Sequence, residues 1–274
     1  MARALIGAST LAAQARLFRK PSLQVLVDNT ILFHSITHET AWISNGKSKW
    51  GPHEIDNGYS ARIPVRAAEN ESREHRNIRY LPGIAHLARI GKVSLMSSGE
   101  LWTERFYQPS GRFNGYGYFD LDLFKDIDMP LIDKIPDMQM GLSWLGLPSV
   151  EEARDQRLAQ STDPLFRSLV SQLGPSNSQD AWHIRTAEVN NMFCFLTMDF
   201  KLLKTMQARA NTDPVRSLRT RVLTPEQLGN YLWLPPVSPT LLSFEDANSP
   251  IRPDLHWPDS KRRKLKRKRT NEHS

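Results

Sequence analysis

Short apolar runs that alternate with helical stretches are the feature that most constrains how this chain can fold. The runs LQVLV (23–27), VSLMSS (93–98) and MFCFLT (192–197) predict short strands, and the first has the pattern of a strand buried on both faces. A fourth short strand is expected at 221–223. Because helical patterns separate these runs, the sequence predicts an α/β domain with a mainly parallel central sheet.

The length of 274 residues suits one large domain, which we place at 23–232, with insertions at about 46–77 and 107–175. The first insertion holds Gly, Pro and the charged run AAENESREHRN, and is expected to be a long surface loop. The second begins irregularly, and two helices are expected at about 149–160 and 164–173. Further helices are expected at 82–92, from 99, from Asp180 and from Pro225.

Both ends of the chain differ from the domain. Residues 1–22 form an N-terminal extension with four basic residues and no acid, a composition that also fits an organelle transit peptide. We favour an ordinary N-terminal helix, because its charges are few. Residues 233–274 are rich in proline and then basic, and are expected to be a disordered tail.

The basic charge of the chain is concentrated in the tail. The segment KRRKLKRKR (261–269) has eight basic residues in nine. The net charge of the whole chain is +7. Lys261, Arg262, Arg263 and Lys264 suit the binding of nucleic-acid phosphates by charge. Nuclear import and a solubilising end are equally consistent with this composition.

Other features exclude several classes of protein. The single cysteine, Cys194, rules out a disulfide framework and a zinc site built from cysteines, and it is expected to be buried. No apolar run approaches the roughly 20 residues that span a bilayer. We therefore expect a soluble, cytoplasmic protein without a membrane partner, or a nuclear or organellar one in a eukaryote.

Acidic residues recur where the predicted strands end. Asp28 follows the first strand, Glu100 follows the second, and Asp199 follows the third. Asp180 begins the helix that leads into the third strand. Because parallel strands present their carboxyl ends at one edge of a sheet, these four acids are expected to converge.

Converging carboxylates repel one another unless a cation compensates them. Mg²⁺ or Mn²⁺ suits such a site, since hard cations prefer oxygen ligands and are often held by a few carboxylates together with substrate phosphates. The chemistry that such a metal supports on a phosphate substrate is hydrolysis of a phosphodiester bond. The aspartates of the second insertion do not match a calcium loop and are expected to be solvated: Asp120, Asp122, Asp126, Asp128 and Asp133.

Four segments in this order resemble PIN-domain ribonucleases: VLVDNTIL, SLMSSGELWTE, DAWHIRTAEVNNMFCFLTMDFKLL and RVLTPEQL. The third carries the strongest similarity, through a helix, a strand and a T-x-D ending. The resemblance implies a three-layer α/β/α fold and metal-dependent endoribonuclease activity. Asp28, Glu100, Asp180 and Asp199 would then be the catalytic, metal-binding acids.

The resemblance also implies partners and supporting residues. RNA would be the substrate, and a toxin-type nuclease would have a protein inhibitor or antitoxin; many such proteins form homodimers. Asn29 or Thr30 would support Asp28, and Thr197 would face the site. His183 is expected to be a packed or substrate-side residue beside the metal ligands.

The chain departs from the family in places. It is longer than a compact PIN domain, its first motif reads DNT instead of the frequent Asp-Thr-Asn, and Glu104 lies one helical turn from Glu100. An inactive PIN-like module that binds RNA or protein is the alternative function. A haloacid-dehalogenase-like phosphatase and a dinucleotide-binding enzyme are disfavoured, because their motifs are missing after the first strand.

Overall fold

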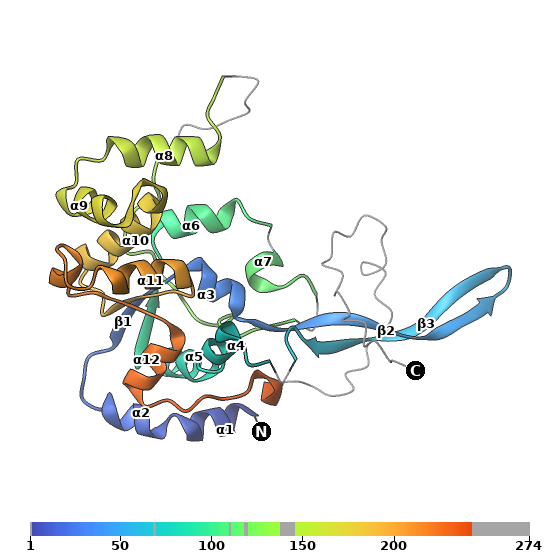
Figure 1. Cartoon of the computed structure of the whole chain (residues 1–274). Helices are drawn as coiled ribbons and strands as arrows, with labels where there is room; N and C mark the ends of the chain where they lie inside the picture. The colour runs from blue at the N-terminus through green and yellow to red at the C-terminus, as the bar shows by residue number, and fades with distance from the viewer. Residues whose placement is uncertain (1, 68–69, 110, 118–119, 138–145, 243–274) are drawn as a thin grey trace, which may run out of the picture.

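A computed structural model of the chain describes residues 2–67, 70–109, 111–117, 120–137 and 146–242. Its centre is a four-stranded sheet in the order β4-β1-β6-β7, and every neighbouring pair is parallel (Figure 1). The strands are β1 (Leu23–Val27), β4 (Val93–Met96), β6 (Cys194–Leu196) and β7 (Arg221–Leu223). This arrangement confirms the predicted α/β domain with a parallel sheet.

Helices fill the connections between these strands. Between β1 and β4 the structure has α3 (Asn29–His34), α4 (Arg73–Ile78) and α5 (Leu81–Arg89). Between β4 and β6 it has α6 (Gly99–Phe106), α7 (Gly111–Asn114), α8 (Val150–Gln160), α9 (Pro164–Leu173), the 3₁₀ turn η2 (Pro175–Asn177) and α10 (Ser178–Val189). After β6 come α11 (Phe200–Ala208), η3 (Val215–Ser217), α12 (Pro225–Leu232) and η4 (Pro239–Leu242).

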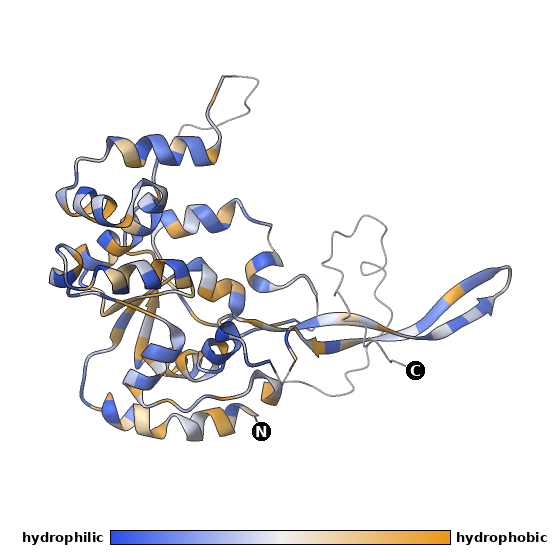
Figure 2. Ribbon diagram, in the orientation of Figure 1, coloured by the Kyte–Doolittle hydropathy of each residue, from blue (hydrophilic) through white to orange (hydrophobic). Residues whose placement is uncertain are grey.

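The two faces of the sheet carry separate hydrophobic clusters. Val25 and Val27 of β1 pack with residues of α5 and α12, whereas Leu26 between them packs with residues of α9, α10 and α11. The strands are among the most hydrophobic parts of the ribbon (Figure 2). Full burial of each such side chain contributes about 1.5–3 kcal/mol, so helices on both faces stabilise the sheet.

The first insertion is a hairpin, so the prediction of a long loop at 46–77 is wrong over most of its length. Strands β2 (Ile36–Trp50) and β3 (His53–Pro64) pair antiparallel from His38 opposite Pro64 to Trp50 opposite His53, and the hairpin projects from the body (Figure 1). The glycines that suggested a loop belong to the hairpin. Gly51 takes a φ of +60° in the turn, and Gly46, with a φ of +105°, follows a register shift.

The second insertion contains the two predicted helices, α8 and α9, at the expected places. Ser149 and Glu152 form the capping box that starts α8. Three aspartates expected to be solvated instead hold the irregular segment to the body. Asp120 accepts hydrogen bonds from Thr40, Asp122 accepts one from Ser35, and Asp133 accepts one from the Gly99 amide.

The N-terminal extension is helical, as expected, but it forms two short helices, α1 (Ala2–Ser9) and α2 (Leu11–Arg16), in place of one. Ala13 and Leu17 are buried in the hydrophobic cluster that also contains α5. Most of the predicted tail, including Lys261, Arg262, Arg263 and Lys264, lies outside the described residues. Among the residues described, no helix combines the length and apolar character needed to cross a membrane.

Candidate acidic site at the carboxyl edge of the sheet

Two of the predicted acids lie just after the ends of adjacent strands, at the same edge of the sheet. Strands β1 and β6 pair with Val27 opposite Leu196. Asp28 directly follows β1, and Asp199 comes three residues after the end of β6. The convergence of these two acids follows from the parallel register of their strands.

Asp28 is nearly buried and is held by two threonines. Its Oδ2 accepts hydrogen bonds from Thr30 Oγ1 at 2.5 Å and from Thr197 Oγ1 at 2.6 Å. Burial raises the pKa of Asp28, although both hydroxyls and the nearby His183 act to lower it. Thr30 therefore supports Asp28 directly, which answers the question of which neighbour in the DNT motif does so.

Asp199 combines a structural and a site-facing role. Its Oδ1 accepts hydrogen bonds from the backbone amides of Lys201 and Leu202, so it is the N-cap of α11. Its own amide donates to Thr197 Oγ1 at 2.9 Å. Its Oδ2 accepts no hydrogen bond within the described residues, which leaves this oxygen available at the edge of the sheet.

Asp180 lies in the first turn of α10, where it does not act as a cap. The N-cap position belongs to Asn177, and Asp180 accepts no hydrogen bond within the described residues. Burial, together with the charges of Asp199, Asp28 and Glu104, raises the pKa of Asp180 to about 6. This electrostatic coupling shows that the acids from four elements lie close to one another.

Helix α6 contributes two acids with different surroundings. Glu100 is 2% exposed and forms an ion pair with Arg157 of α8. Glu104, one turn later, accepts a hydrogen bond from Asn29 Nδ2 at 2.8 Å and lies 3.3 Å from His183 Nε2. Glu104 is therefore the acid of α6 most closely joined to the cluster, whereas Glu100 is balanced by an arginine.

His183 is a buried cation among these acids. Its burial would lower its pKa, but Glu104, Asp28 and Asp180 together raise the pKa of His183 to about 9. The ring also packs against Phe195, with centroids 5.7 Å apart. The expectation of a packed histidine beside the site agrees with this position, and its charge at neutral pH partly offsets the carboxylates.

The donor chemistry of the cluster fits a hard cation. Within the part of the chain that is described, no three His, Cys, Asp or Glu side chains form a group that could hold a metal ion by themselves. Mg²⁺ does not require such a cage, because one or two carboxylates commonly bind it together with waters and substrate phosphates. Asp28, Asp180 and Asp199 each carry carboxylate oxygens of the kind that this mode of binding uses, although within the described residues they do not form a ready group of three ligands.

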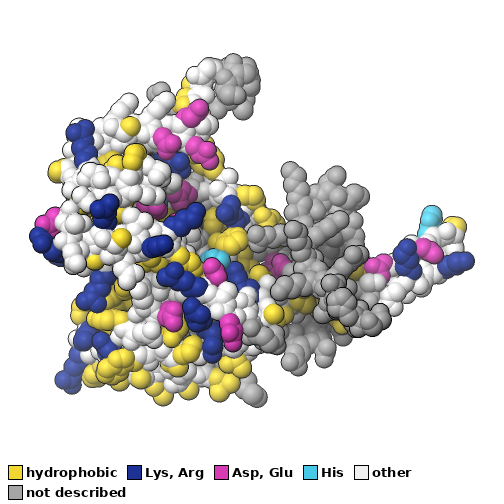
Figure 3. Space-filling view, in the orientation of Figure 1, with side chains coloured by type: hydrophobic (Ala, Val, Ile, Leu, Met, Phe, Trp, Pro, Cys, Tyr) yellow, Lys and Arg dark blue, Asp and Glu magenta, His cyan; other side chains and the backbone are white. Residues whose placement is uncertain are grey.

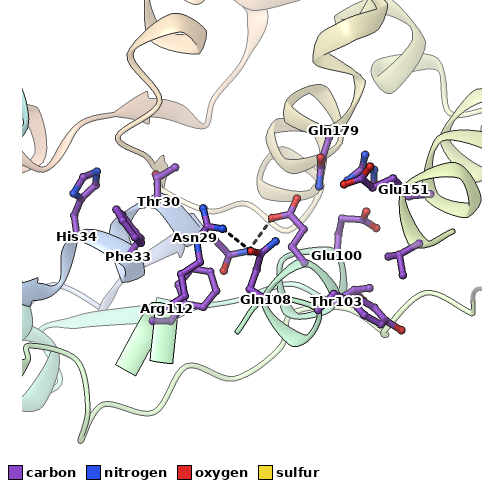
Figure 4. A pocket seen from close by; sticks show the side chains of 15 residues that line it. Asn29, Thr30, Phe33, His34, Glu100, Thr103, Gln108, Arg112, Glu151 and Gln179 are labelled. Atoms are coloured by element: carbon purple, nitrogen blue, oxygen red, sulfur yellow. Dashed lines mark hydrogen bonds between the residues drawn. The ribbon is translucent and has the colours of Figure 1, made fainter. Parts of the chain in front are cut away.

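A pocket of about 390 Å³ opens beside the two glutamates of α6, Glu100 and Glu104. Asn29 of α3, Glu100 of α6 and Gln179 of α10 surround its space (Figure 4), and Glu104 also lines it. The other side of the pocket has aromatic and basic residues: Phe33, Tyr107, Phe113, Arg112 and Arg154. Aromatic rings beside cations suit a nucleotide, through stacking on a base and attraction to phosphates.

Comparison with known proteins does not decide the assignment: no protein-family model, curated protein or solved structure matches this chain. The resemblance to PIN-domain ribonucleases therefore stays a prediction from the sequence motifs.

Sequence reasoning placed Asp28, Asp180, Asp199, Thr197 and His183 near one another, as the structure has them. It favoured Glu100 over Glu104 on α6. The spacing of Glu100 and Glu104 indicates that both could face the site, because residues four apart lie on the same face of a helix. Spacing alone could not show that Arg157, from α8, pairs with the first of the two acids.

Proposed function

We propose that the protein is a metal-dependent endoribonuclease that hydrolyses RNA phosphodiester bonds at the acidic site. The observation that carries this proposal is the meeting of acids from four elements at one edge of the sheet, where burial and the charges of Asp199, Asp28 and Glu104 raise the pKa of Asp180 to about 6. Carboxylates brought together at this cost are typical of functional sites. A bound divalent cation would relieve their repulsion.

In this proposal, Asp28, Asp180 and Asp199 hold Mg²⁺ or Mn²⁺. When bound, the cation would neutralise phosphate charge and activate water for attack. Thr30 and Thr197 keep Asp28 oriented through their hydroxyl groups. Glu104, fixed by Asn29 and His183, orients a water molecule toward the phosphate.

The pocket beside the acids would hold the nucleotide next to the scissile phosphate. The Arg112 guanidinium lies 5.5 Å from the centroid of the Phe33 ring and 5.9 Å from the centroid of the Phe113 ring. This arrangement offers a base a stacking partner and a phosphate a nearby positive charge. RNA with unpaired nucleotides is therefore the substrate class that we propose.

Cleavage of a mixed-sequence single-stranded RNA tests the proposal, with Mg²⁺ or Mn²⁺ and with a chelator. Asp199→Asn is the informative variant, because asparagine caps a helix as well as aspartate does and keeps α11 intact. Asp126→Asn, an exposed position outside the acidic site, is the matched control. We expect metal-dependent cleavage that Asp199→Asn abolishes and Asp126→Asn retains.

An inactive RNA- or protein-binding module is the second candidate. The buried charge of His183 favours it, because an internal cation already offsets part of the negative charge. RNA binding without cleavage by a well-folded protein would support this candidate against the nuclease. The toxin-type role, a protein inhibitor and a homodimer stay predictions that follow from the sequence resemblance.

A further inference from the structure

A second concave surface lies away from the pocket of the acidic site. It is a groove of about 500 Å³ between α11, the segment 215–222 and the start of α4. Its lining includes three cationic side chains, Arg73, Lys204 and Arg221. Among the described residues that line it, none is an aspartate or glutamate. We call this surface the basic groove.

The three cations of the basic groove are exposed and have no ion-pair partner within the described part of the chain. Elsewhere several arginines are paired, such as Arg157 with Glu100 and Arg185 with Asp163. Lysine and arginine side chains, with a few Asp and Glu side chains among them, lie over the region of α11 and α4 on the face shown in Figure 3. Unpaired like charges around one concave surface favour an anion with several charges.

Two of the cations are held in place by aromatic rings. The Arg221 guanidinium lies 5.4 Å from the ring centroids of both Phe193 and Tyr231. The Arg73 guanidinium lies 4.1 Å from the centroid of the Phe200 ring. Stacking on a ring orients a guanidinium without neutralising it, so its N–H groups stay available to phosphate oxygens.

The basic groove also begins next to the acidic site. Phe200, on which Arg73 stacks, directly follows Asp199 in the chain. Lys204 lies on the same helix, five residues after Asp199, or about 7.5 Å along the helix axis. A strand whose phosphate lies at Asp199 could therefore continue along α11 into the groove.

We propose that the basic groove binds the phosphate backbone of the RNA strand beyond the nucleotides at the acidic site. The identity of the anion rests on the proposed function, whereas the groove itself does not. Arg73, Lys204 and Arg221 would each contact a phosphate. These contacts would be independent of base sequence, because every nucleotide carries the same phosphate group.

Equilibrium binding of a labelled single-stranded RNA to the full-length protein tests this inference, in chelator and over a range of salt concentrations. Each phosphate contact on a single strand contributes about 0.7 to the slope of log affinity against log salt. Lys204→Gln should lower the slope by about 0.7 and weaken binding about fivefold at 0.1 M salt. Adding Arg73→Gln should roughly double the change in slope.

Lys125→Gln is the matched control, since it removes the same charge from an exposed lysine outside the groove. It should leave the slope close to that of the wild type, and thermal unfolding should show that all variants are folded. Equal slopes and affinities for Lys204→Gln and Lys125→Gln would overturn the inference. Because no cleavage is measured, failure of the nuclease proposal would be seen separately, in the cleavage assay.

Discussion

His183 Nε2 lies 3.3 Å from Glu104 Oε1. Glu104 is on α6, the helix that follows β4, and His183 is on α10, the helix that leads into β6. The pair joins the two helices across the acidic edge of the sheet. Glu104 is also fixed by Asn29 of α3, so three segments far apart in the sequence meet at one carboxylate. The stability of the site and its proposed chemistry therefore depend on the same contacts.

The charge of His183 should make stability fall as pH rises. Its pKa is raised from 6.5 to about 9 in the folded state, so its contribution is complete below 6.5 and is lost through about 9. The shift corresponds to about 3 kcal/mol at about 1.4 kcal/mol per unit. Urea unfolding of the wild type and His183→Gln should show a difference that shrinks over this range. A constant difference would contradict the assigned charge.

Asp180→Asn should stabilise the protein at neutral pH while it impairs the proposed activity. The pKa of Asp180 is raised from 3.8 to about 6, so the wild type loses stability as pH rises through this interval. The variant should gain up to about 3 kcal/mol above pH 6, and the gain should vanish below pH 4.

Thermal unfolding of both proteins across this pH range measures the effect. Added Mg²⁺ should stabilise the wild type more than Asp180→Asn, because a ligand stabilises only the state that binds it. Equal stabilisation of both proteins by Mg²⁺ would argue that Asp180 does not hold the cation.

Glu104→Gln and Glu100→Gln should differ in their effect on cleavage. Glu104→Gln should lower kcat by about 10²-fold or more, because it removes the carboxylate that we place beside the reacting water. Glu100→Gln should cost little or no stability, because burial outweighs the ion pair with Arg157 and raises the pKa of Glu100, and it should cause a smaller loss of kcat. Single-turnover cleavage and urea unfolding measure the two effects, and the opposite ranking of kcat would restore Glu100 to the site.

Thr197→Val should shift the pH dependence of cleavage. The Thr197 hydroxyl lowers the pKa of Asp28. Loss of this hydroxyl should raise the pKa of Asp28 further and move the acid limb of the pH–rate profile to higher pH. Thr186→Val is the matched control, because the Thr186 hydroxyl is buried without a hydrogen-bond partner within the described residues. An unshifted profile for Thr197→Val would contradict the proposed role of Asp28.

The sequence predicted the sheet and its acidic edge because both arise from local patterns. The run LQVLV forms β1 within the predicted bounds, and Asp28 follows it where a parallel sheet ends. The T-x-D motif at the end of the third predicted strand identified Thr197 and Asp199 as residues of this edge. Strand ends meet by topology, so residues distant in the chain were placed together without any knowledge of contacts.

Other features depend on partners distant in the sequence. The hairpin strands show little alternation of apolar and polar residues, and their glycines favour a loop in a reading of the sequence alone. Pairing with β2 is what makes β3 a strand. In the same way, the position of α8 brings Arg157 to Glu100, and the position of α3 brings Asn29 to Glu104.

The β2–β3 hairpin leaves the body and returns to it at neighbouring points, since His38 pairs with Pro64. The part of the hairpin beyond the buried Thr40, Ser60 and Ala61 can be lengthened, shortened or exchanged while α3 and α4 stay where they are, because the ends that enter the domain remain joined. The outer half of the hairpin is thus a natural attachment point. A label, tag or foreign turn at Gly51 would report on the molecule without entering its hydrophobic interior.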